Sequence, residues 1–128
     1  MLFDTTFVID WAREARRRRP DRASAFLQQH PNIAANISII TVAEFAEGYE
    51  PADEAKCWEA LSRYAVIDIE TAIAWRAGQI SRDLRSRREI IGDNDIWIAA
   101  TAMHHGFSGV SKNAKHFRRV SGLQVIDY

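Results

Sequence analysis

The 128-residue sequence contains a single cysteine, Cys57, and no long apolar run. One cysteine excludes an internal disulfide and fits a reducing compartment. No segment approaches the ~18–20 apolar residues that a membrane-spanning helix needs. The N-terminus starts with a strand-like segment and lacks the plan of a signal peptide. We therefore expect a cytoplasmic protein with no membrane segment.

The sequence also lacks net charge, because 17 basic residues balance 17 acidic ones. Net charge thus gives no indication of a nucleic-acid partner. The basic residues nevertheless gather in three clusters. The first is Arg13, Arg16, Arg17, Arg18, Arg19 and Arg22, the second is Arg82, Arg85, Arg87 and Arg88, and the third is Lys112, Lys115, Arg118 and Arg119. Each cluster is either a solvated helix face or a set of phosphate contacts around an acidic centre.

Several common site motifs are missing. There is no Gly-x-x-x-x-Gly-Lys phosphate loop and no Gly-x-Gly-x-x-Gly. His104 and His105 are adjacent at a predicted helix end, which is not the spacing of zinc ligands. Cys57 lies in an ordinary helical pattern. These features disfavour nucleotide-binding, zinc and cysteine-nucleophile chemistry.

The hydrophobic pattern alternates between strands and helices. Strands are predicted at residues 1–4, 36–40, 65–69, 107–110 and 123–126. Helices are predicted after a cap at Thr5 or Thr6, from a first turn containing Pro20, from a capping box at Thr41–Glu44, from Pro51, and over residues 71–87 and 94–105. This order predicts one α/β domain over residues 1–128, with a central, mostly parallel sheet of about five strands flanked by helices.

Polar residues stand where these predicted strands end or helices begin. Asp4, Glu44, Asp95 and Asn113 all have this position. The carboxyl ends of parallel strands share one sheet edge, so these side chains are expected to converge. Converging carboxylates repel one another unless a cation lies between them, and Mg²⁺ prefers such oxygen ligands.

The pattern therefore predicts a divalent metal site. Asp4 and Asp95 are the best direct ligands, and Glu44 is long enough to hold a metal-bound water or to act as a general base. Each acid also has a structural interpretation. Asp4 fits a helix cap, Glu44 half of a capping box, Asp95 an acid that complements the helix dipole, and Asp93 a loop or cap residue.

Four segments carry a resemblance to a known family: LFDTTFVI (2–9), ITVAEF (40–45), GDNDIWIAATA (92–102) and VSKNAKHF (110–117). In order, spacing and total length, they and the closing VSGLQV (120–125) resemble the PIN-domain ribonucleases, and within them the VapC toxins. The resemblance covers the whole chain, and the block around Asp95 is its most specific part.

The resemblance implies a three-layer PIN-like fold, a Mg²⁺ or Mn²⁺ site and endonucleolytic cleavage of RNA. It also implies a homodimer and a cognate, VapB-like antitoxin that blocks the site. By position, Asp4, Glu44 and Asp95 match the first three acids of the family. Ser111 matches the residue that orients the site, and Asn113 the polar residue after it.

One position departs from the family pattern. The family usually has an acid before the Phe of its last motif, and here that residue is His116. A neutral imidazole does not replace a negative charge, so any second ion should bind more weakly or favour Mn²⁺. A protonated His116 is expected to contact a substrate phosphate, Asp93 is a candidate to restore the charge, and an ordinary surface histidine is an equal interpretation.

Three hypotheses follow. The first is a metal-dependent endoribonuclease toxin, in which Ser111 and Asn113 position the site and the basic clusters hold RNA. The second is a catalytically weakened PIN-like module that binds RNA or an antitoxin. The third is a phosphotransfer domain of the receiver or haloacid-phosphatase type, with Asp4 as phosphoacceptor. The receiver version needs a Lys after a late strand, which Lys112 supplies, but it has no role for the Asp95 block.

Overall fold

The computed structural model describes residues 1–128 and contains a five-stranded, fully parallel sheet. The strands are β1 (Leu2–Phe3), β2 (Asn36–Ser38), β3 (Ala65–Ile67), β4 (Gly109–Val110) and β5 (Val125–Ile126). They lie in the order β3-β2-β1-β4-β5, with Leu2 in register with both Asn36 and Gly109. The prediction of an α/β fold around a parallel sheet is confirmed.

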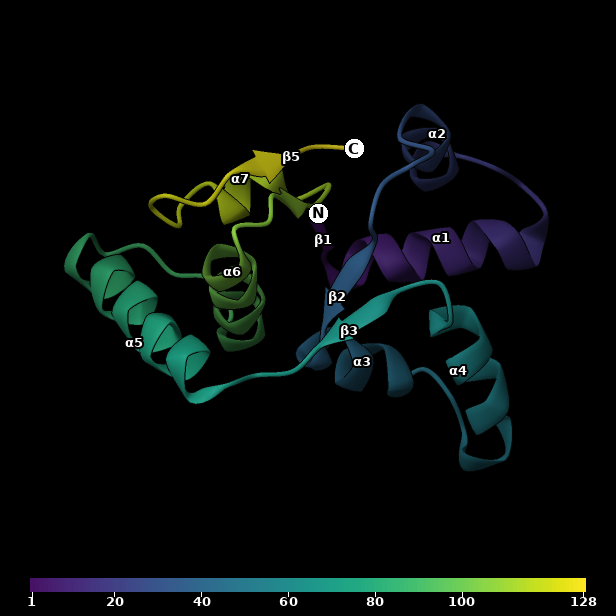
Figure 1. The fold of residues 1–128 in the computed structure, drawn as a ribbon, viewed down its shortest axis with the longest axis horizontal. Coiled ribbons are helices and arrows are strands. Elements are labelled where there is room, and N and C mark those ends of the chain that lie inside the picture. The colour runs from purple at the N-terminus through teal and green to yellow at the C-terminus, as the bar shows by residue number, and fades with distance from the viewer.

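Helices cover both faces of this sheet, giving three layers (Figure 1). One face carries α5 (Thr71–Ser86) and α6 (Asp93–His105), and the other carries α1 (Thr5–Arg17), α2 (Arg22–Gln29), α3 (Ile39–Ala46) and α4 (Glu54–Leu61). A 3-10 helix, η1 (Pro51–Asp53), precedes α4, and α7 (Ala114–Phe117) follows β4. No helix is long and apolar enough to cross a membrane.

The central strand β1 is anchored on both faces of the sheet. Leu2 belongs to the hydrophobic cluster under α5 and α6, and Phe3 to the cluster under α1 to α4. Both side chains are almost fully buried, and burial of each contributes roughly 1.5–3 kcal/mol. Because β1 is fixed from both sides, the residue that follows it, Asp4, has a firmly defined position.

The second strand is shorter than predicted. Residues 39 and 40 are helical, because the Ser38 hydroxyl accepts the Ile40 N–H (3.2 Å) and turns the chain into α3 directly after β2. The predicted capping box at Thr41–Glu44 is therefore wrong. Thr41 and Glu44 lie inside α3 at i,i+3 spacing, so they share a helix face.

Two further helix starts differ from prediction. The cap of α1 is Asp4, not Thr5 or Thr6, because the Asp4 carboxylate accepts the Phe7 N–H (2.9 Å). Pro20 precedes α2, whose N-cap Asp21 makes no side-chain capping bond. The short helix α7 was not predicted, since four residues are too few to show a periodicity.

Glu14 of α1 caps α2 from a distance. Its carboxylate accepts the backbone N–H groups of Asp21 (2.9 Å), Ala23 (3.0 Å) and Ser24 (2.9 Å). Partial burial raises the pKa of Glu14, hydrogen bonds from Ser24, Asp21 and Ala23 lower it, and the net shift is downward. This carboxylate therefore joins the first two helices through charge-assisted bonds.

We predict that Glu14→Gln lowers the free energy of unfolding by about 1 kcal/mol at pH 7. A depressed pKa contributes stability above the unfolded-state pKa, and that stability is lost as the pH falls through the folded-state value. The deficit of the variant should therefore shrink in acid. Urea unfolding at several pH values measures it, with Glu59→Gln as control, since Glu59 is exposed and makes no side-chain hydrogen bond. Equal stability of the two variants at pH 7 would contradict the capping role.

Candidate active site

The candidate site lies at the carboxyl ends of two adjacent strands. From β1 the sheet extends through β2 and β3 on one side and through β4 and β5 on the other. Ligand sites of open parallel sheets form where the strand order reverses in this way. Asp4 follows β1 and Ser111 follows β4, and the Asp4 N–H donates to the Val110 carbonyl (3.1 Å). The two strand ends are thus joined at the reversal point.

Asp4 is a buried carboxylate in an acidic neighbourhood. Its side chain is only 5% exposed. Burial raises the pKa of Asp4 to about 6, against the lowering effect of hydrogen bonds from the Ser111 hydroxyl and the Phe7 N–H. The charges of Asp95 and Asp10 raise this pKa further. The capping interpretation is correct but incomplete, because a simple exposed cap has no reason to be buried against other acids.

Asp95 lies in the first turn of α6, next to the positive end of the helix dipole. The pKa of Asp95 is raised, mainly by burial. The hydrogen bond and the charge of His116 lower this pKa, and the charge of Glu44 raises it further. Its Oδ2 atom lies 3.0 Å from His116 Nε2. His116 is therefore partly buried and contacts one of the candidate acids.

Glu44 reaches the same region from α3. Its Oε1 atom accepts a hydrogen bond from the Thr5 hydroxyl (2.7 Å), which lies 3.1 Å from the Thr41 hydroxyl. Thr41 is fully buried. Sequence reasoning treated Thr5 only as a possible helix cap and so missed this contact. The sequence signal for this contact was the position of the Thr5 hydroxyl directly after Asp4, the acid at the end of the first strand.

Ser111 and Asn113 shape the loop between β4 and α7. Ser111 is 1% exposed, and its hydroxyl oxygen accepts the Asn113 N–H (2.9 Å). The Asn113 side chain is exposed, and its backbone carbonyl accepts the His116 N–H (2.9 Å). Asp93 is the exposed first residue of α6 and makes no hydrogen bond to the other acids. The fold thus brings together Asp4, Glu44, Asp95, Ser111 and His116, while Asp93 stays at the periphery.

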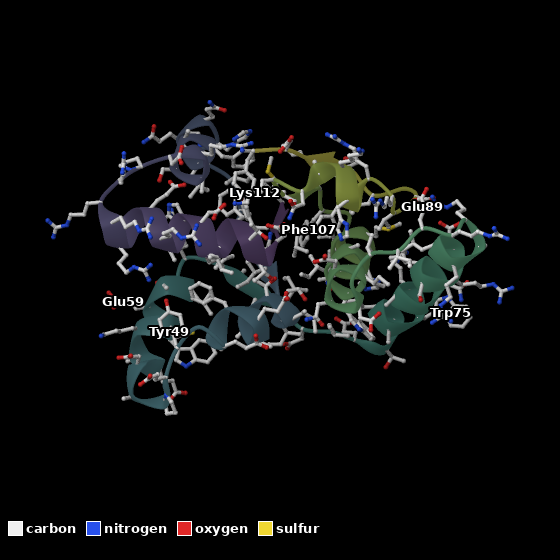
Figure 2. The ribbon with its side chains drawn as sticks, turned by 180° about the vertical axis from the view of Figure 1, so that it is seen from behind. Tyr49, Glu59, Trp75, Glu89, Phe107 and Lys112 are labelled. Atoms are coloured by element: carbon white, nitrogen blue, oxygen red, sulfur yellow. The ribbon has the colours of Figure 1, made fainter.

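Lys112 pairs with an acid that sequence reasoning missed. Its ammonium lies 2.6 Å from Asp10 Oδ2, and the Tyr128 hydroxyl donates to the same oxygen (2.9 Å). Asp10 belongs to α1, so these bonds fasten the loop after β4 to the helix that begins at Asp4; Figure 2 labels Lys112 at this junction. In the receiver hypothesis Lys112 would have to contact Asp4, the phosphoacceptor. Because Lys112 pairs with Asp10 instead, the structure argues against the phosphotransfer hypothesis.

The acidic side chains of the site can hold only a metal ion that keeps some of its water ligands. No three His, Cys, Asp or Glu side chains are placed to enclose a metal by themselves. Mg²⁺ does not require such a cage, because it is commonly held by one or two carboxylates together with waters and substrate phosphates. Asp4 and Asp95 supply two such carboxylates, and the charge of Asp95 helps to raise the pKa of Asp4. The residues present therefore fit a hard divalent cation.

Comparison with known proteins identifies the family. The PIN domain family model matches residues 1–123. Ribonuclease VapC2 of Haemophilus influenzae strain Rd is 34% identical, over 97% of this chain and 94% of its own length. The chain therefore belongs to the PIN-domain family and, within it, to the VapC ribonucleases.

Solved structures show the same fold. VapBC from Salmonella typhimurium, bound to DNA, superposes with a TM-score of 0.84 at 27% identity, covering 98% of this chain and 96% of that one. VapBC2 from Rickettsia felis, bound to a DNA fragment from its promoter, gives 0.82 at 26% identity, covering 99% and 97%. The resemblance seen in the sequence motifs is confirmed.

Proposed function

We propose that this protein is a divalent-cation-dependent endoribonuclease that acts as the toxin of a toxin–antitoxin pair. The observation that carries the proposal is the buried, acid-facing carboxylate of Asp4 at the point where the strand order reverses. Leaving such a carboxylate uncompensated costs free energy, which a bound cation offsets. The ribonuclease names of similar VapC proteins support the reaction class.

In this proposal Asp4 and Asp95 hold Mg²⁺ or Mn²⁺. When bound, such a cation polarises a phosphodiester and makes an attacking water more acidic. Glu44 orients that water and accepts its proton. Thr5 engages Oε1 of Glu44, which leaves Oε2 as the oxygen without a protein donor. The water oxygen would bond to phosphorus as the P–O bond to one ribose breaks, and the released ribose oxygen would take up a proton from solvent.

The remaining side chains hold this arrangement. The Ser111 hydroxyl lowers the pKa of the neighbouring Asp4 and accepts the Asn113 N–H (2.9 Å), so it links the first acid to the loop after β4. Asn113 in turn anchors the start of α7 through its backbone carbonyl, which accepts the His116 N–H. We assign positioning roles to Ser111 and Asn113 on this basis.

A metal-titrated cleavage assay with purified protein tests the proposal. Transfer, ribosomal and messenger RNA are each incubated in EDTA and then with increasing Mg²⁺ or Mn²⁺. Cleavage is expected only with the cation, because no basic side chain balances the buried Asp4 carboxylate. Undiminished cleavage in EDTA, or cleavage of none of these RNAs with either ion, would overturn it.

A second candidate function is a catalytically weakened module that binds RNA or antitoxin. The observation that favours it is the contact of His116 with Asp95 Oδ2, which occupies one oxygen of a proposed ligand. In this case cleavage by the natural protein is feeble even with saturating cation. Substitution of His116, described in the Discussion, separates the two functions.

We also propose two protein partners. One is a VapB-like antitoxin, supported by the VapBC complexes among the structural relatives. The other is a second copy of this chain, as the family resemblance implies. The antitoxin is expected to block the site at the carboxyl edge of the sheet.

A further inference from the structure

An open, polar groove of about 500 Å³ adjoins the candidate site. Asp95 and His116 contribute to its wall, and the third basic cluster supplies Lys112, Lys115, Arg118 and Arg119. Ala114 is the only apolar residue that lines it. A groove of this composition attracts anions but offers little surface for stacking or apolar contact.

Hydrogen bonds and ion pairs divide these cations into two kinds. Lys112 is neutralised by Asp10 (2.6 Å), and the Arg119 guanidinium donates to the Ile90 carbonyl (2.8 Å). Lys115 and Arg118 are exposed and form no salt bridge or side-chain hydrogen bond. They stand three residues apart, at the positions that share one side of a helical turn. These two cations are therefore free to contact a ligand.

The other two basic clusters supply no side chain to the lining of this groove, although Arg22 lies 4.0 Å from Asp127 and Arg87 donates to the Arg119 carbonyl at its wall. In the first, Arg13 pairs with Asp10 (3.3 Å), and Arg22 donates to the Tyr128 carbonyl. In the second, Arg87 pairs with Asp83 (2.8 Å) and Glu89 (3.0 Å). Neither cluster contributes a residue to the groove that contains Asp95. Among the three clusters, the third is the one adjacent to the proposed reaction centre.

We propose that Lys115 and Arg118 bind the phosphates of the RNA segment next to the one that is cleaved. This inference rests on the proposed function and names the element that holds its substrate. His116 is the one ring side chain that lines the groove, and Asp95 engages it, so RNA contacts there are mainly to the backbone and tolerate different sequences. Binding there is electrostatic and therefore depends steeply on salt.

The test is the salt dependence of RNA affinity in EDTA, where cleavage does not interfere. Fluorescence anisotropy with a short single-stranded RNA compares the natural protein with K115A/R118A. Each lost phosphate contact lowers the slope of log affinity against log salt by about 0.7, so the double variant should lose about 1.4. Its affinity at low salt should fall at least about tenfold. Unchanged melting temperatures verify that the exposed substitutions leave the fold intact.

The matched control is R82A/R85A, which removes two exposed, unpaired arginines from α5 and changes the net charge equally. It should retain the natural slope, as should the charge-preserving K115R/R118K. If R82A/R85A lost as much salt slope and affinity as K115A/R118A, the effect would be due to net charge alone. That result would overturn the inference. If K115A/R118A has the natural slope of log affinity against log salt while the natural protein cleaves RNA normally, the groove does not bind RNA phosphates. The proposed function would not be affected by that result. If the natural protein neither binds nor cleaves RNA, the proposed function fails as well.

Discussion

Asp4→Asn is expected to lower RNA cleavage at least about 100-fold while the protein stays folded. Asparagine caps a helix about as well as aspartate, so the bond to the Phe7 N–H and the start of α1 are retained. What the variant loses is the negative charge that the proposed cation requires. Initial cleavage rates with saturating Mn²⁺ measure the effect, and a purely capping role for Asp4 predicts no change.

A suitable control is Asp68→Asn. Asp68 follows β3 at the same edge of the sheet, but it is exposed and makes no side-chain hydrogen bond or ion pair. Its removal should leave cleavage unchanged. Wild-type cleavage by the Asp4 variant, or equal losses in the two variants, would contradict the assignment of Asp4.

Although Asp4→Asn should lower cleavage, it should increase the stability of the folded protein. The folded-state pKa of Asp4, about 6, lies above its ordinary value of 3.8. The stability that a group with a raised pKa contributes is fully present below the unfolded-state value and is lost as the pH rises through the folded-state value. In EDTA at pH 8, Asp4→Asn should therefore be more stable than the natural protein, by on the order of 2–3 kcal/mol.

Urea unfolding in EDTA at pH 4 and pH 8 measures this difference. The two proteins should have nearly equal stability at pH 4, where Asp4 is largely protonated, and diverge between pH 4 and pH 7. If Asp4→Asn were less stable than the natural protein at pH 8, the charged carboxylate would stabilise the fold without a cation. That result would contradict the proposed role of Asp4 in binding a cation.

His116→Asp is expected to raise the affinity for Mn²⁺ at least about tenfold, or ~1.4 kcal/mol. The substitution adds a negative charge beside Asp95 and removes the imidazole from Asp95 Oδ2, which lies 3.0 Å from Nε2. Calorimetric titration of the RNA-free protein with Mn²⁺ measures the affinity directly. His116→Ala is the control, because it frees the same oxygen without adding charge, and should give an intermediate value.

Cleavage by the same variants separates the two candidate functions. If the natural centre is weakened, His116→Asp should increase the cleavage rate together with metal affinity. If it is fully active, metal affinity rises while cleavage at saturating Mn²⁺ stays near the natural rate. Equal Mn²⁺ affinity in all three proteins would show that His116 does not limit ion binding.

Local rules predicted much of the fold but placed several boundaries wrongly. The apolar segments of β1, β2 and β4 and the periodicity of α5 and α6 carry strong signals, and these elements form at the predicted places, although the strands are shorter than predicted. The capping box at Thr41 was wrong because Ser38 offers an earlier cap, which overrides the apolar character of the next two residues. The competition between two such local bonds is not visible in the hydrophobic pattern.

The sequence by itself determined the alternation of strands and helices, and with it the position of Asp4 directly after a strand and of Asp95 at a helix start. Each of these depends on local periodicity, and parallel strands necessarily gather their carboxyl ends. Only the tertiary structure decided that Thr5 bonds Glu44, that His116 contacts Asp95, and that the third basic cluster is the one beside the site. Those contacts depend on β1 lying between β2 and β4, an order set by long-range packing of both hydrophobic clusters rather than by any local segment.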